Sequence, residues 1–77
     1  MANMNMEEAL STQIQEEFYS SHLYLSMAAY CHSVNLNGFA HWMKLQSVEE
    51  RQHAMKLYDY MVQRGWRVSL KEIKKPP

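Results

Sequence analysis

Three residues in this chain combine the side-chain types that proteins use to bind metal ions. Glu50 and His53 stand three positions apart, and Glu17 lies in an earlier segment. Residues three apart on a helix are neighbours, so Glu50 and His53 can reach one common point in front of the helix. Charged and imidazole side chains rarely occupy a packing face without a partner, and we therefore interpret the three residues as metal ligands.

Both segments place these residues within a stripe that is typical of a helix packed against another helix. The steps between stripe residues alternate between four and three, which keeps them on one helix face. The stripe of the first segment comprises Leu10, Ile14, Glu17, Ser21, Tyr24, Ala28 and Cys31. The stripe of the second segment comprises Phe39, Met43, Gln46, Glu50, His53, Leu57, Tyr60 and Arg64. The pattern predicts two helices, each with ionisable residues in its packing face.

The chain also has the signals expected at the start of a helix and at a turn. Asn5 followed by Glu8 resembles a capping box, which places the start of the first helix near Met6. Two Asn and a Gly in segment 33–38 favour a turn between the helices. Because a short connection folds neighbouring helices back on one another, the sequence predicts an antiparallel hairpin that bends near Leu36.

The end of the second helix is marked by Arg64 and Gly65. They place a cation in the last turn and, after it, a residue that tolerates left-handed backbone angles. We therefore expect an all-α fold in which residues 1–77 form one hairpin domain. The expected parts are a flexible N-terminus at 1–5, helices at about residues 6–34 and 38–64, and an extended C-terminal segment at 66–77.

An antiparallel hairpin with this bend brings the candidate ligands to one level. Glu17 lies 19 residues before Leu36, and His53 lies 17 residues after it. The difference of two residues corresponds to about 3 Å along helices that rise about 1.5 Å per residue. We therefore expect Glu17 and His53 to face one another across the two helices.

Composition and charge exclude several classes of protein. Eight basic and eight acidic side chains give a net charge of zero, so nothing forms an electrostatic footprint for nucleic acid. No apolar run is long enough to span a bilayer, and no secretory signal is visible at the start. We expect a cytoplasmic protein without nucleic-acid or membrane partners. The single cysteine, Cys31, excludes an intramolecular disulfide and fits a small buried residue.

Apolar residues are too numerous for two helices to cover by themselves. They make up 47% of the chain, although each helix has only one neighbour to pack against. Further apolar residues flank the two stripes, namely Phe18, Leu25, Trp42, Ala54 and Met61. The excess predicts that the hairpin packs against another hairpin.

Four stretches of the chain together resemble one protein family. These stretches are Glu17–Ala28, Gly38–Lys44, Glu49–Lys56 and Arg64–Val68. They resemble the N-terminal half of bacterial and archaeal non-haem ferritins, and the resemblance covers nearly the whole chain. It implies that the two helices are the first two of a ferritin-like four-helix bundle. It also implies that segment 66–77 is similar to the start of the crossover loop.

The resemblance implies a function as well. In ferritins a di-iron centre inside the bundle oxidises Fe(II) with dioxygen for iron storage or detoxification. Glu17 and His53 resemble terminal ligands of the first iron, and Glu50 resembles the carboxylate that bridges both irons. Tyr24 resembles a tyrosine with a hydrogen-bonding or redox role at the edge of the centre. Glu49 resembles an acidic residue of an auxiliary iron site.

The residues alone leave plainer interpretations open for two of these positions. Glu49 lies one residue off the stripe and fits a solvated side chain, and Tyr24 fits a core aromatic. The metal is also open. A ligand set of carboxylates and one imidazole suits Fe(II) and Mn(II), and Zn(II) would bind as well.

The resemblance further implies that the centre needs ligands from a second hairpin. The chain is expected to be either a truncated ferritin or a half-subunit that pairs with at least one copy of itself, and a ferritin cage is expected only with the other half. Two copies would supply two each of Glu17, Glu50 and His53, the set found in ferritin-like and designed di-iron bundles. A helical self-association module without ferroxidase activity and a non-storage di-metal oxidase remain alternatives.

Overall fold

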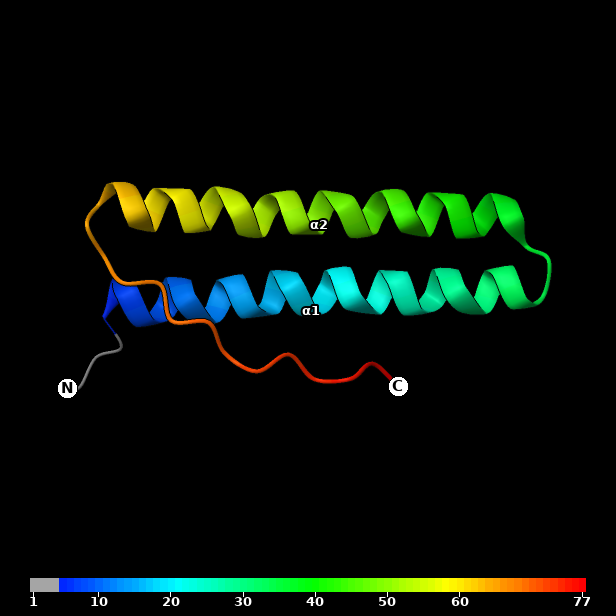
Figure 1. Cartoon of the computed structure of the whole chain (residues 1–77), viewed down its shortest axis with the longest axis horizontal. Coiled ribbons are helices and arrows are strands. Elements are labelled where there is room, and N and C mark those ends of the chain that lie inside the picture. The colour runs from blue at the N-terminus through cyan, green and yellow to red at the C-terminus, as the bar shows by residue number, and fades with distance from the viewer. Residues whose placement is uncertain (1–4) are drawn as a thin grey trace.

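The computed structural model describes residues 5–77, which form two helices and an extended segment (Figure 1). Helix α1 spans Met6–Ser33 and helix α2 spans Asn37–Gln63. The two helices lie side by side and antiparallel in a molecule of 50 × 23 × 16 Å. The predicted all-α hairpin is confirmed, and each helix ends within one residue of its expected bounds. Residues 1–4 of the expected flexible N-terminus lie outside the described residues.

Asn5 caps helix α1, as the sequence predicts. Its Oδ1 accepts a hydrogen bond of 2.7 Å from the backbone N–H of Glu8, which satisfies one of the free donors in the first turn. In a full capping box the Glu8 carboxylate would also accept a hydrogen bond from the backbone N–H of Asn5. Here that carboxylate forms an ion pair with Lys71, whose Nζ lies 2.7 Å away. The cap and the first-turn carboxylates explain why α1 begins at Met6.

Both helices end in the same backbone arrangement. After α1, Asn35 adopts a φ of 62°, and the N–H of Leu36 donates to the carbonyl of Cys31 over 2.8 Å. After α2, Gly65 adopts a φ of 77°, and the N–H of Trp66 donates to the carbonyl of Met61 over 2.9 Å. This is the Schellman motif, which needs a residue that tolerates left-handed angles at the first position beyond the helix. It confirms the turn and the stop signal predicted from the Asn and Gly residues.

Small side chains form the centre of the contact between the helices. In α2 the buried residues recur every seven positions and are Ala40, Ser47, Ala54 and Met61. In α1 the buried residues are Ser11, Ile14, Ala28 and Cys31. Three of these four belong to the stripe predicted for the first helix, and Cys31 is a buried free thiol as expected. We refer to this contact as the helix seam.

The stripe predicted for the second helix is displaced from the helix seam. Phe39, Tyr60 and Arg64 were expected in the packing face and are exposed. Ala54 and Met61 were expected beside that face and are fully buried. Successive residues of a helix point about 100° apart, so an error of one residue moves the predicted face to another side of the helix. The small Ala and Ser residues of the observed contact also contribute little to a hydrophobic pattern. The predicted stripe therefore lies along the side of the helix seam.

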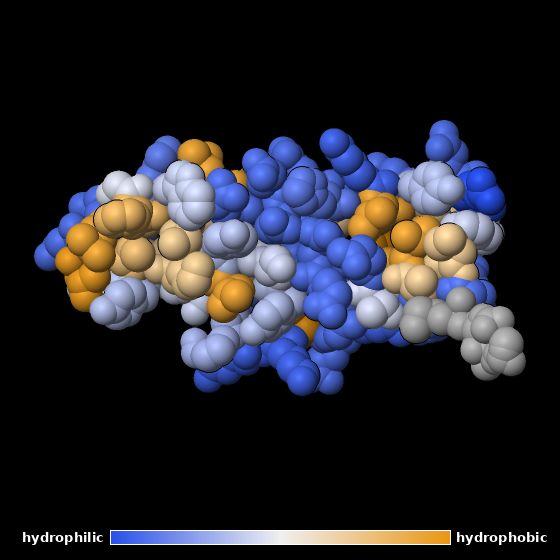
Figure 2. Space-filling model, turned by 180° about the vertical axis from the view of Figure 1, so that it is seen from behind, coloured by the Kyte–Doolittle hydropathy of each residue, from blue (hydrophilic) through white to orange (hydrophobic). Residues whose placement is uncertain are grey.

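The face of the hairpin that Figure 2 shows is not covered by the C-terminal segment, and we call it the open face. Figure 2 shows apolar side chains gathered at both ends of this face and hydrophilic side chains in its middle. Phe39 and Tyr60 stand fourteen and seven residues from His53, so the three share one side of α2. Phe39 is 63% exposed and Tyr60 is 45% exposed. Large exposed apolar side chains in one region mark an interaction surface.

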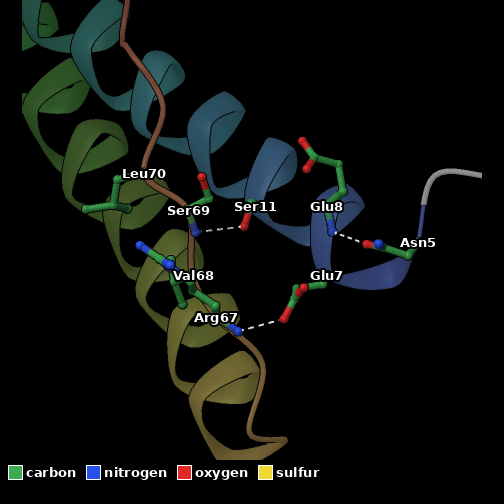
Figure 3. Close-up of a pocket in the computed structure, with 8 residues that line it drawn as sticks. All are labelled: Asn5, Glu7, Glu8, Ser11, Arg67, Val68, Ser69 and Leu70. Carbon is green, nitrogen blue, oxygen red and sulfur yellow. Dashed lines mark hydrogen bonds between the residues drawn. The ribbon is translucent and has the colours of Figure 1, made fainter.

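The segment after α2 is extended, as predicted, and runs back along α1. Figure 3 shows the start of this segment beside the first turns of α1. The backbone N–H of Arg67 donates to Glu7 over 2.8 Å, and that of Ser69 donates to Ser11 Oγ over 3.1 Å. Farther along, the side chain of Gln15 donates to the carbonyl of a segment residue over 2.7 Å. These bonds satisfy backbone groups that an extended strand outside a sheet would otherwise leave to water.

Two side chains of this segment complete the apolar core. Trp66 and Val68 pack against the buried cluster of Ile14, Ala54 and Met61. The core therefore lies towards the end of the hairpin where α1 begins and α2 ends, and the C-terminal segment contributes to it as well as the helices. Neither helix of the described residues is apolar over a sufficient length to cross a membrane.

We predict opposite effects for alanine at the two glycines. Gly65→Ala should lower the free energy of unfolding by about 1 kcal/mol, because an L-residue is strained at the positive φ of this position. Gly38→Ala should be neutral or slightly stabilising, because Gly38 is helical and a Cβ there meets no atom within 4 Å. Urea unfolding followed by circular dichroism measures both variants. Equal destabilisation by the two substitutions would contradict the assignment.

Candidate metal centre

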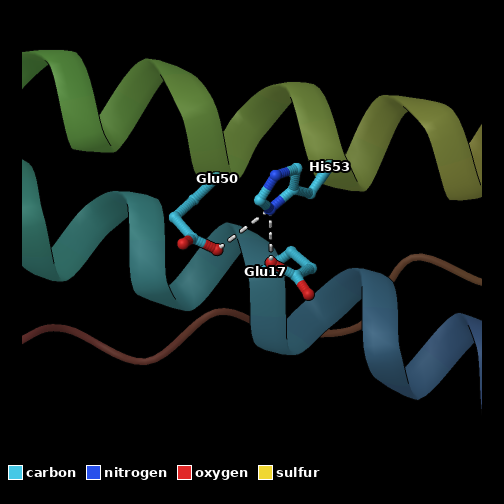
Figure 4. A group of neighbouring side chains, drawn as sticks. All are labelled: Glu17, Glu50 and His53. Atoms are coloured by element: carbon cyan, nitrogen blue, oxygen red, sulfur yellow. Dashed lines mark ion pairs between the residues drawn. The ribbon is translucent and has the colours of Figure 1, made fainter.

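Glu17 from α1 and the pair Glu50 and His53 from α2 converge on one point of the open face (Figure 4). Each offers one ligand atom, and these atoms all lie within 4.8 Å of one another. His53 Nδ1 is 3.6 Å from Glu17 Oε1 and 3.6 Å from Glu50 Oε1. The structure therefore brings together the three residues that the sequence singled out, at the common level expected for them.

The spacing of these atoms fits the coordination of a small divalent cation. Metal–ligand bonds to imidazole nitrogen and carboxylate oxygen are about 2.0–2.2 Å long. With bonds of that length, two ligand atoms 3.6 Å apart subtend an angle of about 120° at the metal, which is close to the trigonal angle and about 10° wider than the tetrahedral one. The role of the three residues as ligands stays a prediction.

The carboxyl groups of Glu17 and Glu50 shift one another's pKa in opposite directions. Their hydrogen bond raises the pKa of Glu50 above its ordinary value, and burial adds to this shift. The same hydrogen bond lowers the pKa of Glu17, helped by a hydrogen bond from Gln13 and the imidazole of His53. Glu50 is therefore the protonated partner when one proton is present. A metal ion would take the place of this proton, since it relieves the same repulsion between the two negative charges.

The three side chains of the site are partly exposed to solvent, so the site lies at the surface of the hairpin and not inside it. The side chains of Glu17 and Glu50 are 18% and 21% exposed, whereas that of His53 is 47% exposed. One side of the site is thus lined by protein and the other is open. Three protein ligands and an open side leave coordination positions for water, substrate or further ligands.

Gln13 is a site residue that the sequence interpretation missed. Its Nε2 donates a hydrogen bond of 2.8 Å to Glu17 Oε2, the oxygen that does not face His53. This bond orients the carboxylate and leaves Oε1 free for a cation. The available signal was the spacing of four residues between Gln13 and Glu17, which makes them neighbours on one helix face.

The other two candidate residues lie outside the three-residue cluster. Glu49 is exposed and is not part of the described metal-ligating group, which agrees with its interpretation as a solvated side chain. Tyr24 is half-buried and packs edge-on against Trp42, with ring centroids 6.4 Å apart. This contact fits the aromatic packing role that the sequence left open for Tyr24. Their auxiliary and redox roles stay predictions.

Comparison with known proteins identifies the family. The sequence model of the ferritin-like domain matches residues 7–77. The chain belongs to the ferritin-like domain family. A bacterial non-heme ferritin of Bacteroides fragilis is 46% identical over 65 residues, which cover 84% of this chain and 41% of that protein. A bacterial non-heme ferritin of Staphylococcus haemolyticus is 40% identical over 76 residues, which cover 99% of this chain and 46% of that protein.

Solved structures agree with this assignment. An open pore ferritin from the hyperthermophilic archaeon Archaeoglobus fulgidus superposes with a TM-score of 0.94 at 48% identity. An engineered closed form of the ferritin from that archaeon superposes with a TM-score of 0.93, also at 48% identity. Each match covers 100% of this chain and 48% or 47% of the other. The chain thus spans about half the length of its ferritin relatives, and its hairpin corresponds to half of the ferritin four-helix bundle.

We predict that Glu17→Gln weakens the binding of Co(II) by at least about tenfold, because it removes a charged ligand of the site. Glu16→Gln is the matched control, since Glu16 is the exposed neighbour and should leave the affinity unchanged. Isothermal titration calorimetry measures both dissociation constants. Equal affinities for the two variants would exclude Glu17 as a ligand.

A second prediction concerns pH. Because the pKa of Glu50 is raised, this carboxyl still holds its proton at a pH where an ordinary Glu has lost it. Co(II) must displace that proton, so the affinity should fall as the pH is lowered towards the raised pKa of Glu50. In Glu50→Gln the affinity is weaker, and its decrease with falling pH should be shallower, because one proton fewer competes with Co(II). Titrations at several pH values test this; identical pH profiles for parent and variant would contradict it.

Proposed function

We propose that this chain supplies half of a di-iron ferroxidase centre, in which Fe(II) is oxidised by dioxygen for iron storage or detoxification. The observation that carries the proposal is the convergence of Glu17, Glu50 and His53 on the open face, with ligand atoms that all lie within 4.8 Å of one another (Figure 4). In a hairpin that corresponds to half of the ferritin bundle, this face is the one that a second hairpin would cover. The cluster would then lie in the interior of the completed bundle.

Each of the three residues has a distinct role in this proposal. Glu17 and His53 would hold the first iron as terminal ligands, and Glu50, on losing its proton, would supply a carboxylate to both irons. Gln13 fixes the orientation of the Glu17 carboxylate. Two Fe(II) ions supply one electron each for the reduction of dioxygen, and carboxylates favour the higher charge of the Fe(III) product. Mn(II) and Zn(II) would compete for the same ligands.

The remaining ligands would come from a second hairpin. Another copy of this chain would add a second Glu17, Glu50 and His53, and the other half of a longer ferritin chain would add an equivalent set. In either case, the apolar side chains at the two ends of the open face would pack against the added helices. We therefore propose a homo-oligomer of at least two hairpins. A storage cage belongs to the proposal only where the other half is present.

Two further residues are assigned secondary roles. Tyr24 lies seven residues after Glu17 in α1 and packs against Trp42 of α2. It would act in hydrogen bonding or electron transfer at the edge of the centre. Glu49 would add an auxiliary iron site from its exposed position beside Glu50. The cytoplasmic location expected from the sequence stays a prediction of the same proposal.

The ferroxidase proposal predicts that His53→Ala lowers the rate of Fe(II) oxidation to that of buffer alone. His41→Ala is the control, because His41 is also an exposed imidazole on α2 but lies outside the metal-ligating cluster. Aerobic Fe(II) addition, followed by the absorbance of the Fe(III) product, measures the rate. Oxidation by His53→Ala at the rate of the parent protein would overturn the proposal.

A metal-free self-association module is the second candidate, and the exposed apolar residues of the open face favour it. Glu50→Leu separates the two functions. Under the metal-free interpretation this substitution stabilises the assembly, because a partly buried carboxyl is replaced by an apolar side chain, and native mass spectrometry finds no iron in the parent. Under the ferroxidase proposal, the parent binds iron and Glu50→Leu loses it. Storage and non-storage oxidases are then distinguished by the native mass, since storage requires a hollow shell.

A further inference from the structure

We propose that Ser21 and Ser47 are positioning residues that set the level and the distance at which Glu17 meets Glu50 and His53. The inference rests on the proposed function only in assigning a metal to the cluster. The serine contact itself is a feature of the hairpin. It joins α1 and α2 in the middle of the helix seam.

The two serines bond reciprocally across the helix seam. Ser21 Oγ donates to the backbone carbonyl of Ser47 over 2.8 Å, and Ser47 Oγ donates to the backbone carbonyl of Ser21 over 2.8 Å. The two hydroxyl oxygens are 2.9 Å apart. Each bond reaches the main chain of the opposite helix, so the helices must approach closely for both to form. Larger side chains at these positions would hold the backbones too far apart.

The serine contact lies one helical turn from the metal cluster on both helices. Glu17 precedes Ser21 by four residues, and Glu50 follows Ser47 by three residues. At about 1.5 Å of rise per residue these steps are about 6 Å and 4.5 Å, in the same direction along the hairpin. A change in the offset or the separation of the two helices at the serines should therefore move the ligand atoms of the two helices relative to one another by nearly the same amount.

The serine contact also favours the observed register of the two helices over registers in which α2 is shifted by seven residues along α1. Steps of seven residues from the serines bring Ile14 level with Ala54, and Ala28 level with Ala40. A slip of one such step that brings Ser21 opposite Ala54 also brings Ala28 opposite Ser47, so small residues would still face one another. The two hydroxyls would then no longer face one another, so their 2.9 Å contact would be lost, and each could bond only to the main-chain carbonyl opposite it. One polar pair within an apolar seam is a known means of selecting a register.

The first experiment measures the register without metal. Spin labels on Ala29→Cys and His41→Cys, two exposed positions on the two helices, report the distance between α1 and α2 in a Cys31→Ala background. In Ser21→Ala/Ser47→Ala the seam loses its polar pair, so the label distance should shift or its distribution should broaden. An unchanged, equally narrow distribution would overturn the inference. The single serine variants, which each retain one cross-helix bond, should give intermediate results.

The second experiment measures the metal site with Co(II), whose visible absorption reports coordination geometry. The double serine variant should bind Co(II) about tenfold more weakly than the parent and show an altered absorption band. Ser11→Ala is the matched control, because Ser11 is also buried and hydrogen-bonded but bonds to the C-terminal segment. It should lower the unfolding free energy without changing the Co(II) affinity or spectrum.

The outcomes separate this inference from the proposed function. Parent-like Co(II) affinity and spectrum in the double variant overturn the inference, even where the parent binds metal and oxidises iron. A parent that binds no Co(II) overturns the proposed function, and the label distances alone then decide whether the serines set the register. An equal loss of Co(II) binding in Ser11→Ala would show a general effect of stability and would also overturn the positioning role.

Discussion

The close approach of the two helices is the constraint on which the rest of the structure depends. Alanine and serine along the helix seam let the main chains come near enough for side-chain hydroxyls to reach the opposite carbonyls. Such a contact buries little apolar area per residue, and most large apolar side chains are displaced to its two sides. The seam consequently determines the distance and the register of the two helices more than it stabilises them. Much of the stabilisation must come from the larger apolar side chains that pack beside the seam.

The cluster of Glu17, Glu50 and His53 lies where this arrangement leaves polar groups partly in contact with water. A carboxylate pair in a closed core would carry a large desolvation cost, whereas the side chains of Glu17 and Glu50 lie at the side of the seam and remain partly exposed. The charge that an added cation brings would relieve this pair at the moment when another hairpin removes the solvent. Metal binding and assembly of the bundle are therefore expected to favour one another.

The sequence predicted the helices, the turn and the meeting of Glu17, Glu50 and His53, because capping residues and the lengths counted from the turn determine them. It misplaced the buried face of α2, since Ala54 and Ser47 contribute little to a hydrophobic pattern although they lie in the contact. It also gave no indication that the extended segment would dock on α1. That docking depends partly on main-chain donors, such as the N–H of Ser69, which are not visible in a sequence pattern, and partly on the packing of Trp66 and Val68.

The layered helix seam also has a consequence for the order of folding. Its levels join residues progressively farther apart in the chain: 12 residues for Ala28 and Ala40, 26 for the serines, and 40 for Ile14 and Ala54. Closing a longer loop costs more conformational entropy, so contacts next to the turn form at the lowest cost and each level shortens the loop for the next. Glu17 and His53 meet beyond the serine level. The chain would therefore present its ligands as a set only after most of the hairpin has closed, and a metal ion would encounter an organised site and not a flexible chelator.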